Sequence, residues 1–234
     1  MYAADLAYIH HAGFGDVARR AAPEIVAILR GHGIRSGRIV EAGCGSGIVA
    51  RALTDAGYRV RGFDASPAMI RLARSNAPGA AFEVGTIASA SIARGDAVIA
   101  IGEIINYTRS WRTVARFVRR VSNALRPGGL FVFDFIASAE RRTFAPKTVA
   151  GDDWALLVRA DLSDRGRVLT RRMTIVRRVA GRYQRSREVH RVHVWPSAKV
   201  ESALVDAGFA VRLRHSYGRY RLLPGDVAVV AQRR

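Results

Sequence analysis

The segment Glu41–Gly47 constrains the fold of this chain more than any other feature of the sequence. It reads Glu-Ala-Gly-Cys-Gly-Ser-Gly, after the apolar run 38–42 and before residues 48–56, whose apolar positions have helical spacing. Glycines at alternate positions let the backbone turn tightly and approach a ligand closely, and the following helix offers unpaired N–H groups there. A strand, a glycine-rich turn and a helix in this order are typical of a nucleotide site.

The residues around this loop favour S-adenosylmethionine (SAM) over a dinucleotide. Asp64 ends the next predicted strand, 21 residues after Gly43, where a carboxylate can accept hydrogen bonds from both ribose hydroxyls. The dinucleotide fingerprint G-x-G-x-x-G would require glycine at position 48, but the chain has Ile48. Glu41 beside the loop suits a ligand that carries cations, and SAM carries an ammonium and a sulfonium group.

The rest of the first half alternates short apolar runs with helical patterns. This alternation predicts a parallel sheet covered by helices. The expected strands are 38–42, 59–63, 81–84, 96–101 and 130–136, and the expected helices are 48–56, 66–76 and 111–125. Ser66 followed by Pro67 is a typical helix start.

The pattern changes after residue 136. Three β-like runs, 154–162, 167–178 and 187–195, predict an antiparallel unit inserted after the fifth strand. A helix from 196 to 208 and two closely spaced strands, 209–215 and 226–231, then complete the sheet. We therefore predict a Rossmann-like α/β fold: a mostly parallel seven-stranded sheet with an antiparallel last strand, plus a small antiparallel β insertion. The predicted domains are 1–136 with 196–234, including an N-terminal helical lid over 1–35, and a capping insertion over 137–195.

Charge and composition limit the partners. The formal net charge is +19, and all but two of the 38 basic residues are arginine. They occur along the whole chain, and Arg171 and Arg172, adjacent in a predicted strand, point to opposite faces. We therefore expect dispersed charge and a small-molecule partner rather than nucleic acid. No run approaches the roughly 20 apolar residues that a membrane span needs.

Composition also bears on metals and location. The chain has one cysteine, and His190 and His193 fall on opposite faces of a predicted strand, so we expect no metal site. The first residues lack a basic segment followed by an apolar one, from which we expect a cytoplasmic protein. The sequence leaves the oligomeric state open.

Four segments in order resemble the class I SAM-dependent methyltransferases. They are 41–47, the glycine loop; 62–69, Gly-Phe-Asp-Ala-Ser-Pro-Ala-Met; 100–107, Ala-Ile-Gly-Glu-Ile-Ile-Asn-Tyr; and 125–130, Leu-Arg-Pro-Gly-Gly-Leu. The insertion has a counterpart in enzymes similar to glycine N-methyltransferase and to sugar N-methyltransferases, where it caps the active site. The resemblance implies a SAM-dependent methyltransferase with this cap.

The resemblance also implies a set of SAM-binding residues. The glycines would pack against the methionine part of SAM, Glu41 would support the loop, and Asp64 would bind the ribose. Thr86 departs from the acidic residue common at its position, although Ile87 can offer its backbone N–H to the adenine. The full set is Tyr8, Glu41, Gly43, Cys44, Gly45, Gly47, Asp64, Ala65, Met69, Thr86, Ile87 and Ile101.

On the acceptor side the resemblance points to Glu103, Tyr107 and His10 as candidate catalytic residues. Glu103 follows the fourth strand, where it would hold a cationic amine, take a proton from the acceptor, or support the backbone. Tyr107 would line the pocket or belong to the core. In the stretch 6–14, Tyr8, His10 and His11 would belong to a lid, or to an amphipathic helix packed on the sheet. His190 and His193 lie on opposite faces of their strand, one of which should pack inward, and the sequence does not decide which histidine, if either, reaches the acceptor.

Three functions fit these observations. The first is methyl transfer from SAM to a nitrogen or oxygen of a small molecule, which the predicted cap favours. The second is methylation of RNA or protein, favoured only by the charge. The third is a non-catalytic SAM-binding subunit, which intact SAM-binding residues alone do not distinguish from an enzyme. We expect the first.

Overall fold

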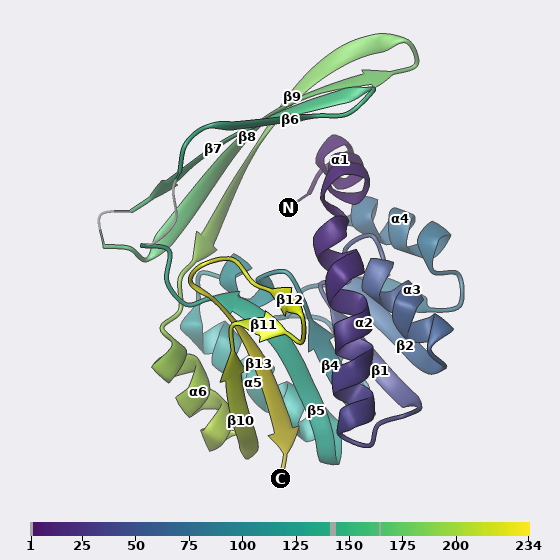
Figure 1. The fold of residues 1–234 in the computed structure, drawn as a ribbon, viewed down its shortest axis with the longest axis vertical. Coiled ribbons are helices and arrows are strands. Elements are labelled where there is room, and N and C mark those ends of the chain that lie inside the picture. The colour runs from purple at the N-terminus through teal and green to yellow at the C-terminus, as the bar shows by residue number, and fades with distance from the viewer. Residues whose placement is uncertain (1, 141–143, 164) are drawn as a thin grey trace.

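A twisted seven-stranded sheet forms the centre of the protein (Figure 1). The computed structural model describes residues 2–140, 144–163 and 165–234. The strand order is β10-β13-β5-β4-β1-β2-β3, and β13 runs antiparallel to both of its neighbours. The strands are β1 (Gly37–Ala42), β2 (Tyr58–Asp64), β3 (Ala81–Val84), β4 (Gly95–Ala100), β5 (Leu125–Ile136), β10 (Phe209–Arg214) and β13 (Asp226–Arg233). The predicted Rossmann-like sheet with an antiparallel last strand is confirmed.

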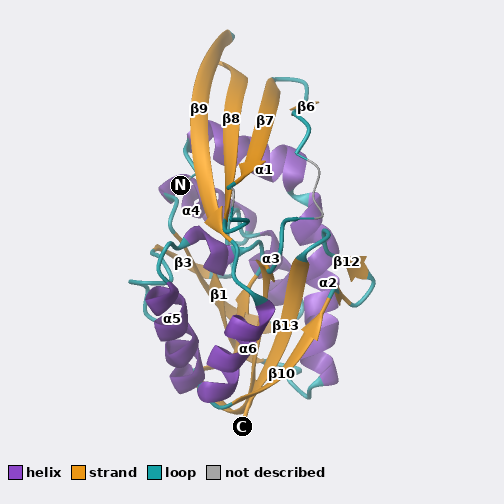
Figure 2. Cartoon of the chain, turned by 90° about the vertical axis from the view of Figure 1, so that its left-hand side faces the viewer, coloured by secondary structure: helices purple, strands orange, loops and turns teal. Residues whose placement is uncertain are grey.

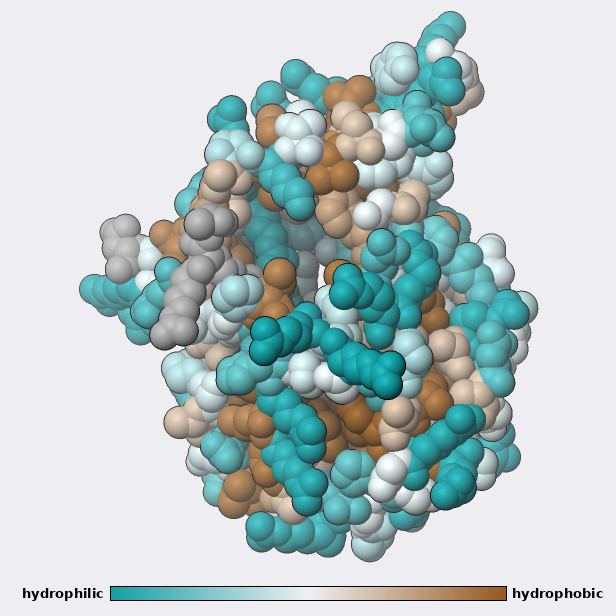
Figure 3. All heavy atoms as spheres, viewed as in Figure 1, coloured by the Kyte–Doolittle hydropathy of each residue, from teal (hydrophilic) through white to brown (hydrophobic). Residues whose placement is uncertain are grey.

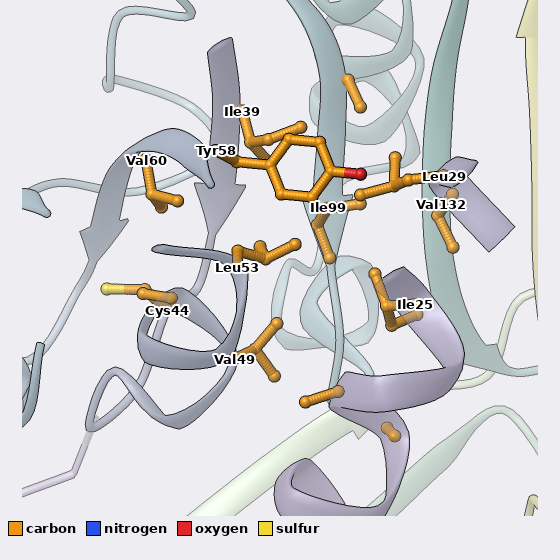
Figure 4. Packing of buried hydrophobic residues seen from close by; sticks show 14 of the residues in the cluster. Ile25, Leu29, Ile39, Cys44, Val49, Leu53, Tyr58, Val60, Ile99 and Val132 are labelled. Atoms are coloured by element: carbon orange, nitrogen blue, oxygen red, sulfur yellow. The ribbon is translucent and has the colours of Figure 1, made fainter. Parts of the chain in front are cut away.

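Helices cover both faces of this sheet (Figures 1 and 2). One face packs against α2 (Asp16–Gly31), α3 (Ile48–Asp55) and α4 (Pro67–Asn76), and the other against α5 (Trp111–Ala124) and α6 (Ser197–Asp206). Figure 4 shows the first face, where Ile25 and Leu29 of α2 meet Val49 and Leu53 of α3 over the strands. Burial on both faces explains why β1, β4 and β5 read as continuous apolar runs.

Local chemistry fixes where two of these helices begin. The Ser66 hydroxyl accepts a hydrogen bond from the Met69 backbone N–H at 3.2 Å, and Pro67 occupies the first helical position of α4. The Ser110 hydroxyl accepts from the Thr113 N–H at 3.4 Å at the start of α5.

Because β1, β2, β4 and β5 run parallel, their carboxyl ends meet at one edge of the sheet, where α/β proteins bind their ligands.

A second, four-stranded antiparallel sheet stands at this edge, in the order β6-β7-β8-β9 (Figure 2). Its strands are β6 (Lys147–Ala150), β7 (Trp154–Leu162), β8 (Val168–Val179) and β9 (Arg182–His193). The sequence predicted three strands here and missed β6, which has only four residues. It also began β9 five residues late, because the arginine-rich start of β9 is exposed and has no apolar alternation. Pairing with β8 keeps that segment extended.

The N-terminal segment divides into two helices with different partners. Helix α1 (Ala4–Phe14) packs Leu6 and Ile9 against Trp154, Leu156 and Ile175 of the β6–β9 sheet, whereas α2 covers the central sheet. Of the described part of the expected helical lid over 1–35, Tyr2 and α1 contact the β6–β9 sheet through a shared apolar cluster.

Two further elements differ from the sequence expectation. Strand β5 begins at Leu125 rather than Leu130, because its pairing with β4 resumes on both sides of an irregularity at the Arg-Pro-Gly-Gly turn. A hairpin of β11 (Ser216–Tyr217) and β12 (Tyr220–Arg221) was not foreseen, and it buries Tyr217 completely. Within the described residues, no helix is both long and apolar enough to span a membrane.

Candidate functional site

The three glycines of the loop after β1 share a positive φ but differ in their surroundings. All three glycines have positive φ, +69° at Gly43, +51° at Gly45 and +79° at Gly47. A Cβ at Gly43 would collide with the Ile104 side chain, and one at Gly47 would lie 2.9 Å from the Ala73 Cα. A Cβ at Gly45 would meet nothing within 4 Å. Gly43 and Gly47 therefore serve packing, whereas Gly45 borders open space that a ligand can enter.

Asp64 holds this loop from the end of β2. Its carboxylate accepts a hydrogen bond from the Gly45 N–H at 3.0 Å on one oxygen and from the Ser66 N–H at 2.8 Å on the other. Each carboxylate oxygen can accept further bonds, so ligand hydroxyls can still bind there. Burial raises the pKa of Asp64 above its usual value, although both backbone donors oppose that shift.

Glu41 is the buried acid of the loop. Its side chain is 3% exposed, and among the described residues its Oε2 has no hydrogen-bond partner. Burial, followed by repulsion from Asp64, raises the pKa of Glu41 to about 8. A buried carboxyl oxygen without a donor is costly, and a cationic ligand group bound at the loop would offset that cost.

The other expected cofactor residues surround the loop in different ways. The Cys44 N–H donates to the Phe63 carbonyl at 3.0 Å, and its thiol is buried. Met69 is buried beside Ala7 and Ala68. Thr86 is exposed, with its hydroxyl accepting from the Ser89 N–H. Four of the residues lie at strand ends or just beyond them: Ala65 follows β2, Thr86 and buried Ile87 follow β3, and Ile101 follows β4.

The two remaining N-terminal candidates point in different directions. Tyr8 donates to Asp153 at 3.1 Å, and the Arg177 guanidinium lies 3.7 Å from the centre of its ring. Tyr8 therefore faces the β6–β9 sheet rather than the glycine loop. His11 contacts the loop directly, because its Nδ1 lies 2.9 Å from the Ser46 hydroxyl.

The backbone after β4 is held by Asp134 of β5. The Asp134 carboxylate accepts from the Gly102 N–H at 2.9 Å, the Glu103 N–H at 2.6 Å and the Tyr217 hydroxyl at 3.2 Å. Burial raises the pKa of Asp134 to about 6, against the effect of these donors. Glu103 adopts a left-handed conformation, φ +63°, so these bonds fix a strained turn. Asp134 therefore holds the backbone of this turn in place.

Arg171 of β8 reaches the same turn from the second sheet. Its Nη2 lies 2.8 Å and 3.1 Å from the two carboxylate oxygens of Glu103. Burial opposes the charge of Arg171, but the Glu103 carboxylate together with the Tyr107 and Tyr2 side chains raises the pKa of Arg171 above its usual value. The sequence indicated Glu103 but gave no sign of this partner, which lies 68 residues away.

Aromatic and imidazole rings gather above the turn. The ring centre of Tyr2 lies 5.1 Å from that of His10 and 4.8 Å from that of His190, and Tyr107 lies 5.8 Å from His190. The hydroxyls of Tyr2 and Tyr107 are 3.4 Å apart. Burial, followed by His11, lowers the pKa of His10 to about 4. This ring cluster, Tyr2, His10, Tyr107 and His190, joins the N-terminal segment, the turn after β4 and the second sheet.

The cluster also connects to the expected cofactor side. The Ser66 hydroxyl, two residues after Asp64, donates to the backbone carbonyl of Tyr2 at 2.6 Å. In the space-filling view, the surface is hollowed between the two sheets (Figure 3). The glycine loop and the ring cluster thus lie at one edge of the central sheet.

The methyltransferase-domain family matches residues 39–129, which include the glycine loop, Asp64 and the turn after β4. Residues 39–129 therefore match a methyltransferase domain. A ubiquinone biosynthesis O-methyltransferase of Methylobacterium sp. (strain 4-46) is 37% identical over 122 residues, 49% of this chain and 46% of that protein. A dTDP-3-amino-3,6-dideoxy-alpha-D-glucopyranose N,N-dimethyltransferase of Streptomyces fradiae is 26% identical over 56% of this chain and 52% of its own length. The chain spans about half the length of the curated relatives it matches.

Solved structures extend the likeness in fold over the whole chain. DesVI of Streptomyces venezuelae aligns with a TM-score of 0.83 at 18% identity and full coverage of both chains. A SAM-bound amino pentose methyltransferase of Micromonospora echinaspora aligns at 0.80 and 21% identity, covering 100% of this chain and 98% of its own. At these identities the likeness shows that the methyltransferase domain and the β6–β9 sheet share one fold with these proteins.

The residues of the methyltransferase domain fit SAM. Gly45 borders open space, the unpartnered Glu41 oxygen suits a cationic ligand, and Asp64 retains acceptor capacity for hydroxyls. Sequence reasoning missed the contributions of Tyr2 and Arg171, which no local motif marks. For the histidines of β9, the structure settles the face: His190 is 4% exposed, whereas Val189 on the other face is 53% exposed.

Proposed function

We propose that this protein transfers the methyl group of SAM to a nitrogen or oxygen of a small-molecule acceptor held between the central sheet and the β6–β9 sheet. The main supporting observation is that the glycine loop, which has room for SAM, and the ring cluster lie at the same edge of the central sheet. The curated relatives, an O-methyltransferase and a sugar N,N-dimethyltransferase, support this class of reaction.

In this proposal the cofactor side is built by the sequence-predicted residues. Gly43, Gly45 and Gly47 would shape the methionine pocket, Asp64 would bind the ribose hydroxyls, and Glu41 would compensate positive charge. The adenine would lie among Ala65, Met69, Thr86 and Ile87, with Cys44 and Ile101 lining the floor. The position of Tyr8 against Asp153 supports a role in closing the site rather than in touching SAM.

The protein's contribution to the reaction is mainly positional. SAM, when bound, supplies an already activated methyl group. The chain's own residues would orient the acceptor in line with that group and keep water out. Glu103, Tyr107 and His10 are the proposed acceptor-facing residues, and the ion pair of Glu103 with Arg171 favours an orienting role for that carboxylate.

The β6–β9 sheet and α1 support a small acceptor over a macromolecular one. Trp154 and Leu156 pack on Leu6 and Ile9, so the second sheet and the N-terminal helix meet over the site. The hydrogen bond from the Ala3 N–H to Glu188 adds a polar contact between them. A ring-sized metabolite fits such an enclosure better than a nucleic-acid helix does.

Two measurements test the proposal. Calorimetry on the purified protein should detect binding of SAM and S-adenosylhomocysteine but not of NAD. A screen with methyl-labelled SAM, small hydroxylated ring compounds and small amines should then reveal transfer, which Gly45→Val should abolish. NAD binding without SAM binding would refute the cofactor assignment. SAM binding without transfer to any small molecule would instead favour a non-catalytic subunit or a macromolecular acceptor.

A further inference from the structure

A histidine–carboxylate pair lies on the inward face of β9. The Nε2 of His190 is 3.0 Å from Oε2 of Glu188, and these side chains are 3% and 10% exposed. Residues alternate along β9, so His190 and Val192 are buried while Val189 and Arg191 are exposed. A charged or polar pair hidden from water usually has a specific partner or role.

Glu188 is itself held in place by the N-terminal segment. Its second oxygen, Oε1, accepts a hydrogen bond from the Ala3 backbone N–H at 3.0 Å. An ionised carboxylate only accepts hydrogen bonds, so the Nε2 of neutral His190 must carry the hydrogen. The lone pair of the ring is then on Nδ1. In this tautomer the ring can accept a proton at Nδ1.

The surroundings of His190 belong to the ring cluster. Tyr2 and Tyr107 present their rings edge-on to it, and Arg171 is its paired residue on β8. The charged and titratable groups around it are Glu188 on its own strand, Arg171 from β8, Tyr107 from the turn after β4, and His10 and Tyr2 from the N-terminal segment. Arg171 in turn binds Glu103.

The other candidate bases are less suited to remove a proton. Glu103 is bound through both oxygens to Arg171, so its carboxylate is engaged in an ion pair. His10 has a lowered pKa, about 4, and its Nδ1 has no partner among the described residues to orient it. His190 is the member of the ring cluster with a carboxylate hydrogen-bonded to its ring, the arrangement that orients histidine bases generally.

We propose that His190, oriented by Glu188, is the general base that deprotonates the acceptor, and that the acceptor is a hydroxylated ring compound methylated on oxygen. This inference rests on the proposed function and narrows it. A neutral amine attacks a methyl sulfonium without a base, whereas a hydroxyl must lose its proton. The rings of Tyr2 and Tyr107 provide flat apolar walls for a ring-shaped acceptor.

The step balances without a further reactant. The acceptor oxygen forms a bond to the methyl carbon as the sulfur–methyl bond breaks, and that electron pair stays on sulfur. The hydroxyl proton passes to Nδ1 of His190, so the positive charge lost at sulfur appears on the imidazolium. The Glu188 carboxylate stabilises that imidazolium, and the proton leaves to solvent when the methylated product departs.

The kinetic test compares His190→Gln and Glu188→Gln with His193→Gln, a control on the outward face of the same strand. A hydroxylated ring compound turned over by the wild type serves as acceptor, and S-adenosylhomocysteine binding is measured for each variant. We expect His190→Gln to lower kcat by roughly 10²–10⁴-fold, to bind S-adenosylhomocysteine like the wild type and to lose the acidic limb of the pH–rate profile. Glu188→Gln should shift that limb to lower pH, and His193→Gln should match the wild type.

A second measurement does not depend on turnover. Nitrogen NMR of the ¹⁵N-histidine-labelled wild type with S-adenosylhomocysteine should show His190 with hydrogen on Nε2, and the resonance is assigned by its loss in His190→Gln. Hydrogen on Nδ1 instead would overturn the proposal.

The remaining outcomes are also decisive. Undiminished transfer by His190→Gln, or wild-type methylation of amines but of no hydroxylated ring compound, refutes the role of His190 as base. Absence of any methylated acceptor despite SAM binding refutes the acceptor assignment. Failure of the wild type to bind SAM refutes the proposed function itself, while the tautomer of His190 still reports on the His190–Glu188 pair.

Discussion

Arg171 of β8 and Glu103 in the turn after β4 form an ion pair, with Nη2 2.8 Å from Oε2. The pair joins two sheets that share no strand, at the turn next to the proposed acceptor site. Their side chains are 24% and 15% exposed, so the pair is partly shielded from water. This contact ties the position of the β6–β9 sheet to the conformation of the turn.

The ion pair predicts a measurable coupling energy. Arg171→Met and Glu103→Gln should each lower the free energy of unfolding by about 1–3 kcal/mol, less than for a fully buried pair because solvent screens part of the charge. The double variant should lose clearly less than the sum of the two losses. Urea unfolding of the wild type, the two single variants and the double variant measures the coupling energy. Additive losses would mean that the two side chains do not interact in solution.

Glu41 predicts a pH-dependent stability. Its folded pKa, about 8, lies above the usual value of 4.5, so the folded protein keeps a proton that the unfolded chain releases between these pH values. Wild-type stability should therefore fall as pH rises through this window. Relative to pH 4.5, Glu41→Gln should gain roughly 2–4 kcal/mol over wild type by pH 8, since each pKa unit corresponds to about 1.4 kcal/mol. Parallel pH profiles of the two proteins in urea unfolding would contradict the raised pKa.

Asp64 and Gly45 predict graded losses of SAM affinity. Asp64→Ala should weaken binding by about 1–3 kcal/mol, the range for losing hydrogen bonds to a charged group, and it also removes the acceptor of the Gly45 N–H. Gly45→Val should be worse, because it places a branched side chain in open ligand space at φ +51°. Calorimetric titration with SAM measures both. Wild-type affinity in both folded variants would place SAM elsewhere.

The Tyr217 hydroxyl predicts an effect on turnover from outside the site. Tyr217→Phe removes one donor from Asp134, while the Gly102 and Glu103 N–H donors remain. We expect a loss of about 1 kcal/mol in unfolding free energy and a lower kcat with unchanged SAM affinity, because the turn carrying Glu103 loosens. Unfolding, steady-state kinetics and calorimetry provide the three readouts. A changed SAM affinity with normal kcat would assign Asp134 to the cofactor side instead.

The charge predicts weak, non-specific binding of nucleic acid. Arg171 points into the site and Arg172 pairs with Asp161 on the outer side, as their adjacent positions required. The surface most able to contradict this prediction is the outward face of β9, where Arg185, Arg187 and Arg191 are all exposed. We expect filter binding to total RNA to disappear at moderate salt and labelled methyl to stay out of RNA. Tight binding lost in a triple charge reversal of these arginines would show that β9 binds RNA.

The sequence by itself determined the central sheet and the residues of the proposed cofactor side. Apolar runs, a Ser-Pro helix start and glycines at positive φ act within a few residues, so they could be read locally. Gly43, Gly45, Gly47, Asp64 and Glu41 all belong to segments 41–47 and 62–69, where the chain turns at the ends of β1 and β2. The short strand β6 and the exposed half of β9 escaped prediction because backbone pairing, not apolar periodicity, maintains them.

Only the tertiary structure decided the acceptor side. Tyr2, Glu103, Tyr107, Arg171 and His190 come from three segments up to 188 residues apart, and no pattern in the sequence couples them. Strand register places Arg171 opposite His190, and the hydrogen bonds of Asp134 turn Glu103 toward Arg171. Along β9, alternate side chains point to two opposite faces of the strand. The face that carries His190 is the one turned toward α1, because apolar Leu6 and Ile9 of α1 bury Met173 and Ile175 on the adjoining strand. Long-range burial, which residue order does not encode locally, therefore determines which residues line the proposed acceptor site.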